Sequence, residues 1–311
     1  MKNNILVTSI SSKVILLELI RTAINKYDKN ILLYGADINS KAIATYFVDK
    51  FLEIPRLKYL KITTLIDICN KEKIKYIIPT RDDDVKYFSF YKKKLLKNGI
   101  FVFSPEYKSV KFCFDKLMFY KKSKLEQVIK TSKYINHIKQ KKLVVKERFG
   151  SGSSSIVINI NKKNAKKHAK ELNNPIFQPF IKGDEYSIDS YLDENNTCIA
   201  CIIRSRDLII DGEAKITTIK KDKKLKGIIV EFLQKHKIIG HSVTQVIKSK
   251  NNYHIIECNT RFGGASSLSY KMGLESFYWF LLETNNKIIK TKLSNKKLRQ
   301  VRVSKDIYFE S

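Results

Sequence analysis

Three polar side chains alternate in the segment ECNTR at residues 257–261. Successive side chains of a β-strand point to opposite faces, so this spacing predicts that Glu257, Asn259 and Arg261 share one face. Two oxygen donors beside a guanidinium group can bind a metal ion and the charge of a phosphoryl group together. The opposite face of the strand is expected to carry His254, Ile256 and Cys258.

The preceding strand adds a third oxygen donor if the two strands form a hairpin. A three-residue turn at 250–252 sets Ser249 opposite Tyr253 and Gln245 opposite Glu257. Carboxylate and amide oxygens suit magnesium, which keeps several waters and shares its shell with substrate phosphates. A hydrogen-bonded polar strip on an exposed sheet face is the alternative. The two glycines of the following RFGG segment disfavour it, because they let the backbone approach a ligand closely.

A lysine followed by a loop rich in glycine and serine forms a second candidate site. Lys146 lies near the end of the apolar segment LVVKERF, and the loop GSGSSS covers residues 150–155. Backbone N–H groups and hydroxyls of such a loop can surround phosphates. Taken alone, the loop is equally typical of a hairpin, and the spacing GxxxxGK[ST] of a Walker P-loop is absent.

A third candidate is the extended segment FQPFIKGDEYSID at residues 177–189. Apolar side chains with free backbone groups can form a slot for adenine, which needs one donor and one acceptor. Glu185 would then accept hydrogen bonds from ribose hydroxyls. The simpler interpretation, a strand that leaves one subdomain for the next, is compatible with this function.

The first hundred residues must position part of this site, and they alternate short apolar strands with helices. This rhythm predicts an open parallel sheet with helices on both faces. A dinucleotide-binding sheet with Asp37 on the ribose is the alternative, but the first turn, TSISSK, lacks the glycines that admit a pyrophosphate. We expect strands at 5–10, 31–37, 74–80 and 100–105, and helices at 14–23, 62–73 and 85–97.

After Pro105 the pattern predicts an α+β unit and then a strand-rich unit. The expected helices are 114–129, 162–172 and 225–236, and the expected strands of the first unit are 142–149, 156–160 and 176–181. Hairpin turns are expected at 193–196 and 249–253, followed by an apolar helix and a tail with one strand, QVRVS. The predicted domains are residues 1–113, 114–181 and 182–290, with a basic C-terminal tail at 291–311.

Together, the motifs resemble the ATP-grasp superfamily in their order along the chain. The order is Asp115-Lys116, Lys146 with its loop, QPFIKGDEYS, Gln245 and ECNTRFGG. It is most similar to small carboxylate–amine ligases related to the large subunit of carbamoyl phosphate synthetase and to the pyrrolysine biosynthesis ligase. GADINSKAIATYFVDKFLEIP and IIPTRDDD resemble the leading domain of that group. The resemblance implies a Rossmann-like domain, a small lid and a larger, mainly antiparallel core.

The resemblance also implies roles for individual residues. ATP would be bound by Lys116 and Lys146, by a phosphate-covering lid at Ser151, Gly152, Ser153, Ser154 and Ser155, by an adenine hinge at Gln178, Pro179, Phe180 and Ile181, and by Glu185. Magnesium, as two ions for which manganese could substitute, would be held by Gln245, Glu257 and Asn259. Arg261, Arg204 and Arg206 would act on the reacting groups. Thr260 and Glu147 stand where the family usually has proline.

These roles imply an ATP-dependent ligase that forms a C–N bond through an acyl phosphate, with small-molecule carboxylate and amine substrates. Two alternatives are an ATP-grasp phosphotransferase that forms no amide and an inactive basic protein that binds nucleic acid or another polyanion. Arg204, Arg206 and Lys215 indicate an anionic substrate, for which an amino acid and a sugar acid fit equally well.

Lysine and arginine outnumber aspartate and glutamate by 60 to 30, which gives a formal net charge of +30. Such an excess is typical of proteins that bind nucleic acid. Here it is mostly lysine spread among many Ile and Asn residues, a composition that A+T-rich codon usage also produces. We therefore expect a solvated lysine surface and no nucleic-acid partner.

The five cysteines form no even, regularly spaced framework, which indicates a reducing compartment and a cytoplasmic protein. Cys198 and Cys201 have CxxC spacing, but residues three apart in a strand face opposite sides and no second pair completes a zinc site. The first residues indicate a strand, a turn and a helix in place of a signal peptide. No apolar run reaches about 18 residues, so no membrane span is expected. A homodimer is the expected oligomer.

Overall fold

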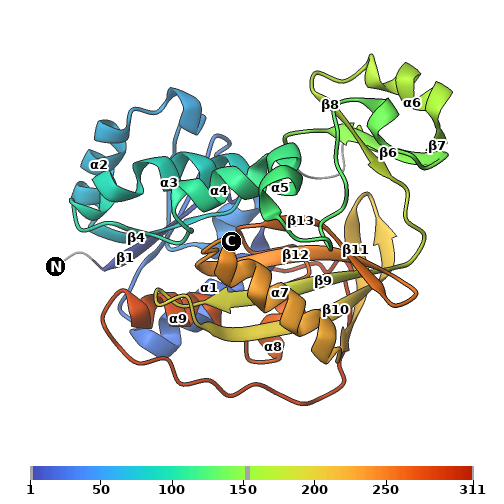
Figure 1. The fold of residues 1–311 in the computed structure, drawn as a ribbon. Coiled ribbons are helices and arrows are strands. Elements are labelled where there is room, and N and C mark those ends of the chain that lie inside the picture. Colours follow the sequence, from blue (N-terminus) through green and yellow to red (C-terminus); the bar gives the residue numbers. More distant parts are fainter. Residues whose placement is uncertain (1–2, 151–154, 310–311) are drawn as a thin grey trace.

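Three β-sheets organise residues 3–150 and 155–309, the part of the chain that the computed structural model describes (Figure 1). A parallel five-stranded sheet comes first, a three-stranded antiparallel sheet follows, and a six-stranded antiparallel sheet completes the fold. This arrangement confirms the predicted fold class. The predicted domain boundaries stay predictions.

The first sheet has the strand order β3-β2-β1-β4-β5, with helices on both faces. Every residue of β1 and β2 is buried, as expected for parallel strands covered on both sides. Ile5 and Val7 pack on the α1 side, and Leu6 packs on the side of α2 and α3. The elements are β1 (Asn4–Thr8), α1 (Val14–Tyr27), β2 (Leu33–Asp37), η1 (Ile43–Phe47), β3 (Lys50–Glu53), η2 (Leu57–Tyr59), α2 (Ile62–Lys71), β4 (Ile74–Pro79), α3 (Asp82–Leu96) and β5 (Phe101–Val102).

Two short helices, α4 (Tyr107–Phe114) and α5 (Lys116–Ser123), link the first sheet to the rest of the chain. The single helix predicted over 114–129 is wrong, because Asp115 leaves the helical conformation and caps α5 through its side chain. The second helix ends at Lys124, which takes a left-handed conformation. The chain then runs extended and bridges β13 at Val128.

The three-stranded sheet forms a lid that stands at one end of the molecule with α6 beside it (Figure 1). Its strand order is β7-β6-β8, and Leu143, Val145 and Phe177 form a small apolar cluster with Ala165 of α6. The elements are η3 (Ile135–His137), β6 (Lys142–Glu147), β7 (Val157–Asn161), α6 (Lys162–Ala169) and β8 (Pro175–Pro179).

The six-stranded sheet has the order β13-β12-β9-β10-β11-β14. Helix α7 buries Leu225, Ile229 and Phe232 against one face of this sheet. The expected turns after β9 and β12, the helix α7 and the strand near residue 300 are present. The elements are β9 (Asp184–Leu192), β10 (Cys198–Ile210), β11 (Glu213–Lys220), α7 (Lys223–Lys235), β12 (Gly240–Ser249), β13 (Asn252–Asn259), α8 (Ser267–Lys271), α9 (Ser276–Glu283) and β14 (Arg299–Val301).

One hydrophobic cluster joins the first sheet to the six-stranded sheet. Leu17 of α1 and Trp279 of α9 belong to it, together with Tyr191 of β9 and Ile5 of β1. This shared core holds the first domain against the six-stranded sheet. Among the helices of the described residues, none is long and apolar enough to cross a membrane.

Candidate active site

Four adjacent strands of the six-stranded sheet each bring one polar residue into a single row. The strand pairings set Arg204 on β10 beside Ser187 on β9. On the other side, Gln245 on β12 lies between Ser187 and Glu257 on β13. All four residues line a cavity of about 520 Å³ between this sheet and the lid. That volume lies within the range of small-molecule sites.

The turn between β12 and β13 differs from the prediction. It contains two residues, 250 and 251, so Ser249 pairs with Asn252. The expected pairing of Ser249 with Tyr253 is therefore wrong by one residue. Lys250 has a φ of +53°, the left-handed conformation that two-residue hairpin turns require.

A β-bulge restores the register further along the same hairpin. Val246 pairs with Ile255 and Gln245 with Glu257, so Ile256 is the extra residue. The predicted pairing of Gln245 with Glu257 is confirmed. Ile256 lines the cavity beside Glu257, and its expected place on the opposite face is wrong.

The three predicted metal ligands, Gln245, Glu257 and Asn259, line this one cavity. Asn259 donates a hydrogen bond of 3.1 Å to Glu257, and Gln245 accepts one of 2.7 Å from Arg206. Within the described residues, no group of three or more His, Cys, Asp and Glu side chains is arranged to hold a metal. A metal in this cavity would therefore depend on one carboxylate and two amide oxygens, which are hard donors.

Two lysines from the lid side face the polar row. Lys146 on β6 is buried, and burial lowers its pKa to about 8 against the opposing influence of Glu257. Lys116 begins α5, where its Nζ donates a 2.6 Å hydrogen bond to the carbonyl of Gly150. Both line the cavity, as the phosphate-binding role predicted for them requires. A buried cation without an ion pair is costly unless an anionic ligand accompanies it.

Of the predicted phosphate-covering lid, residues 151–154 lie outside the described residues. They are Ser151, Gly152, Ser153 and Ser154. Ser155 is exposed, with a φ of +62°, and its carbonyl lies 3.0 Å from Nε2 of His168. Gly150, at the other end of the loop, lines the cavity.

The predicted adenine hinge, residues 178–181, borders the same cavity. Gln178 is buried and donates to Thr131, so its side chain holds the hinge to the extended segment that follows α5. The N–H of Phe180 already donates to the carbonyl of Lys142. Among the described residues Ile181 has no backbone hydrogen bond, which leaves its N–H and carbonyl groups for a ligand. Pro179, which pairs with Leu143 at the end of β8, completes this wall.

Arg206 uses both terminal nitrogens within the protein, while its buried Nε has no hydrogen-bond partner among the described residues. It donates to Gln245 and to the carbonyl of Gly212, each at 2.7 Å, and lies 3.7 Å from Glu185. Glu185, the predicted ribose ligand, keeps 39% of its side chain exposed at the cavity wall. Arg206 thus holds together two side chains that were predicted to contact the ligand.

Arg261 is held by a residue of the first domain to which the sequence interpretation gave no role. Asp82, at the start of α3, accepts from Nε of Arg261 at 2.8 Å and from Nη2 at 3.0 Å. This bidentate pair fixes the plane of the guanidinium group at the cavity wall. The segment IIPTRDDD resembles the leading domain of the family, and its run of acidic residues is the sequence feature that points to Asp82.

Arg204 is held by a second residue that the sequence interpretation missed. Asp189 on β9 is completely buried and accepts a 2.6 Å hydrogen bond from Nε of Arg204. A signal was present, because Glu185, Ser187 and Asp189 alternate along one strand and therefore share one face.

A second cavity adjoins the first between the parallel-sheet domain and the six-stranded sheet. Arg261, Gly263 and Gly264 line both cavities. The second cavity also contains Lys13, whose pKa is lowered to about 8 mainly by burial and then by Arg81.

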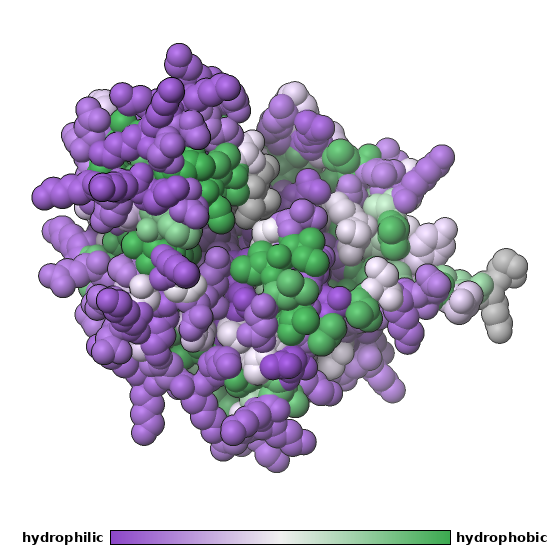
Figure 2. Space-filling model, turned by 90° about the vertical axis from the view of Figure 1, so that its right-hand side faces the viewer, coloured by the Kyte–Doolittle hydropathy of each residue, from purple (hydrophilic) through white to green (hydrophobic). Residues whose placement is uncertain are grey.

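Figure 2, which looks onto the side of the molecule that carries the lid, shows hydrophobic side chains gathered on an otherwise hydrophilic surface. Exposed apolar residues on β10 are Leu208, Ile209 and Ile210.

Two family models match consecutive parts of the chain. Residues 5–103 match the family described as PylC-like, N-terminal domain, and residues 113–265 match the ATP-grasp domain. The comparison with curated proteins finds no match.

Solved structures share the fold over nearly the whole chain. A biotin carboxylase–β,γ-ATP complex from Campylobacter jejuni has a TM-score of 0.73 at 13% identity, over 93% of this chain and 73% of that one. The biotin carboxylase domain of 2-oxoglutarate carboxylase from Hydrogenobacter thermophilus, with MgADP, ADP and bicarbonate, has a TM-score of 0.74 at 14% identity, over 93% and 71%. N5-carboxyaminoimidazole synthetase from Staphylococcus aureus, complexed with ADP, has a TM-score of 0.72 at 14% identity, over 94% and 81%. The chain therefore belongs to the ATP-grasp superfamily and carries a PylC-like N-terminal domain.

Proposed function

We propose that this chain is an ATP-dependent ligase that joins a carboxylate to an amine through an acyl phosphate. The observation that carries the proposal is the polar row on the six-stranded sheet, which faces Lys116 and Lys146 across one cavity. Family membership supports ATP as the phosphoryl donor, and the similar structures include complexes with ADP.

The nucleotide would lie between the sheet and the lid. Adenine would contact the free backbone groups of Ile181, and the triphosphate would extend toward Lys116 and Lys146. Gln245, Glu257 and Asn259 would hold magnesium, which neutralises phosphate charge when bound. For Gln245 this requires that its oxygen exchange the hydrogen bond from Arg206 for the ligand.

The reaction has two displacements. One oxygen of the acceptor carboxylate attacks the γ-phosphorus, and the bond from that phosphorus to the bridging oxygen breaks, so ADP leaves with the electron pair. The amine then attacks the acyl carbon, the C–O bond to the phosphoryl group breaks, and phosphate leaves with an oxygen from the carboxylate. The amine nitrogen loses one proton as the amide forms.

The side chains of this chain supply charge and position for these steps. Lys146 and Lys116 would contact the phosphates, and Arg261, held in place by Asp82, would stabilise the transferred phosphoryl group. Closure of the lid over the cavity would exclude water, which would otherwise hydrolyse the acyl phosphate.

An ADP-release screen tests the proposal. Purified protein is supplied with ATP and magnesium and with pairs of carboxylates and amines, amino acids and sugar acids included. We expect release of ADP and phosphate that requires both substrates. Phosphorus NMR separates the phosphotransferase alternative, because a stable phosphorylated product in place of free phosphate would contradict the proposal.

A further inference from the structure

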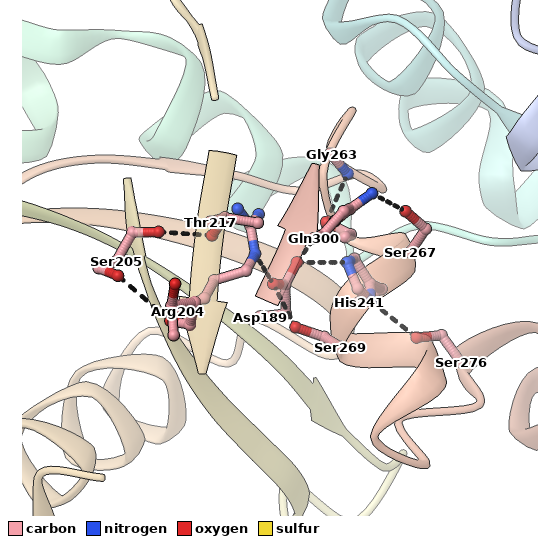
Figure 3. Close-up of polar contacts among 12 residues, drawn as sticks. Asp189, Arg204, Ser205, Thr217, His241, Gly263, Ser267, Ser269, Ser276 and Gln300 are labelled. Atoms are coloured by element: carbon pink, nitrogen blue, oxygen red, sulfur yellow. Dashed lines mark hydrogen bonds and ion pairs between the residues drawn. The ribbon is translucent and has the colours of Figure 1, made fainter. Parts of the chain in front are cut away.

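A buried polar network lies directly behind the cavity wall, and Asp189 is its centre (Figure 3). This carboxylate accepts from Nε of Arg204 at 2.6 Å, from the hydroxyl of Ser269 at 2.7 Å and from the hydroxyl of Ser266. His241 adds its Nε2 at 3.6 Å from the carboxylate, and its Nδ1 lies 2.7 Å from the hydroxyl of Ser276. The network thus joins β9, β10 and β12 to α8 and the segments around it.

Such a network is hard to explain by stability alone. Removing a carboxylate and a guanidinium group from water costs several kcal/mol, and well-packed apolar residues commonly do as well or better. Asp189 stays ionised because the Arg204 guanidinium group and His241 hold its pKa well below the usual range against the effect of burial. The network therefore indicates a function for the group that it holds.

That group is the outer end of Arg204. Only Nε is used by Asp189, and neither terminal nitrogen has a hydrogen-bond partner among the described residues. Figure 3 shows the terminal nitrogens on the far side of the guanidinium group from Asp189. The residue is 3% exposed, yet it lines the nucleotide cavity, so its remaining donors face that cavity.

The same network also holds Gly263 at the junction of the two cavities. The N–H of Gly263 donates 3.0 Å to the hydroxyl of Ser266, which itself donates to Asp189. A Cβ atom added to Gly263 would lie 2.8 Å from that hydroxyl and 3.8 Å from Nη2 of Arg204. Asp189 thus positions both the Arg204 guanidinium group and the adjacent backbone.

We propose that the two terminal nitrogens of Arg204 bind the reacting carboxylate of the acceptor at this junction, and that Asp189, Ser266 and Ser269 are positioning residues for it. This inference rests on the proposed ligase function. A guanidinium group binds a carboxylate through two parallel hydrogen bonds, and here Nε is fixed from behind, which leaves one pair of donors in one orientation. The bound carboxylate would lie beside the phosphoryl-transfer site and open toward the second cavity.

Arg206 provides a matched control on the same strand. It faces the same cavity, but it donates to Gln245 and Gly212 and lies beside Glu185. A simple carboxylate should therefore contact Arg204 and leave Arg206 undisturbed.

The test is nitrogen-detected NMR of arginine side chains during titration with sodium acetate, with sodium chloride at the same ionic strength as the reference. Arg204→Lys and Arg206→Lys assign the two guanidinium signals. We expect acetate to shift the Arg204 signals in a saturable manner and to leave those of Arg206 unchanged. Equal shifts for the two arginines, or shifts no larger than those with chloride, would overturn the proposal.

Two variants test the positioning role. Asp189→Asn keeps the shape of the side chain and removes its charge, and Ser269→Ala removes one supporting hydroxyl with little risk to folding. We expect both to weaken acetate binding at Arg204, Asp189→Asn by about 10-fold or more, as loss of a charge-assisted hydrogen bond predicts. Unchanged acetate binding in Ser269→Ala and in folded Asp189→Asn would overturn the positioning role.

Acetate binding does not require turnover, so it separates this inference from the proposed function. If acetate binds at Arg204 but no carboxylate supports ADP release, the ligase proposal fails and the anion site stands. If ADP release occurs, Ser269→Ala and Asp189→Asn should raise KM for the carboxylate more than KM for ATP. Equal increases in the two KM values would count against the assigned site.

Discussion

The two ends of the central cavity differ in the partners of their arginines. Arg204 and Arg206 lie two residues apart on β10 and line the same cavity. At the proposed acceptor end, Arg204 is anchored from behind by the buried Asp189, and its terminal nitrogens are without partners among the described residues. At the proposed nucleotide end, Arg206 donates to Gln245 and Gly212 and lies beside Glu185. The position of a residue along a strand determines on which face of the sheet its side chain lies. The hydrogen-bond partners of that side chain determine whether it is free to bind a ligand.

The largest expected difference between the two ends is in the free energy of unfolding that is lost when each arginine is replaced by leucine. Arg204→Leu leaves Asp189 as a completely buried carboxylate without its ion pair, so we expect the free energy of unfolding to fall by about 3–5 kcal/mol. Arg206→Leu is the control. Its carboxylate partner, Glu185, is 39% exposed, so no buried charge is left without a partner and we expect a smaller loss than in Arg204→Leu. Denaturant unfolding measures both, and equal losses would remove the distinction.

Replacement of Glu257 tests the proposed metal site at the nucleotide end of the cavity. Glu257→Gln keeps the size of the side chain and removes the one carboxylate among the three proposed metal ligands. We expect ADP release to fall by about 10²- to 10³-fold with an unchanged circular dichroism spectrum, because the site would hold magnesium less tightly and magnesium compensates the charge of the phosphates.

The matched control for Glu257 is Glu147→Gln. Glu147 lines the same cavity, but its carboxylate accepts from the backbone N–H groups of Asn173 and Asn174. ADP release should therefore change little in this variant. Unchanged ADP release in Glu257→Gln would show that the metal assignment is wrong.

Lys146 tests whether the nucleotide end recognises phosphate through its buried cation. Lys146→Met should weaken binding of a non-hydrolysable ATP analogue by about 10- to 100-fold, since a charge-assisted hydrogen bond is lost, and should leave acetate binding at Arg204 unchanged. Isothermal titration calorimetry gives the first affinity and NMR the second. A parallel loss of acetate binding would indicate that the two ends are not separate sites.

The smallest expected effect is a pH dependence of the stability that Arg204→Leu loses relative to wild type. In the native protein the pKa of Asp189 is lowered, so its contribution to stability is present above the unfolded pKa of about 3.9 and is lost only as pH falls through the lower, folded value. In Arg204→Leu, burial without the guanidinium group should raise that pKa. The carboxylate then takes up a proton in the folded variant as pH falls.

The stability difference between wild type and Arg204→Leu should therefore shrink between pH 7 and pH 4. Unfolding curves at several pH values measure it. A difference that grows on acidification would contradict an ionised Asp189 in the native protein.

Much of the site could be predicted from local sequence patterns. Alternation along one strand placed Glu257 and Asn259 together, and the hairpin brought Gln245 to Glu257. That pairing was reached although the turn is one residue shorter than predicted, because the bulge at Ile256 compensates for it. Turn length and bulges depend on packing between strands, which single-strand periodicity does not contain.

The partners of the arginines could not be predicted in the same way. Asp82 and Arg261 are 179 residues apart, and tertiary contacts such as the shared core between α1 and α9 bring their domains together. Asp189 lies in an alternating polar pattern that was visible, but its burial depends on α8 and the RFGG segment. Tertiary contacts of this kind decide which predicted site residues are free to bind ligands.

Oxygen transfer tests the central claim most directly. The acceptor found in the ADP-release screen is labelled with oxygen-18 in its carboxylate and incubated with the protein, ATP, magnesium and the amine. If an acyl phosphate forms, one labelled oxygen must leave with the phosphate, and phosphorus NMR will show its isotope shift in the released phosphate. Phosphate that carries no label, with ADP and the amide still produced, would contradict the mechanism.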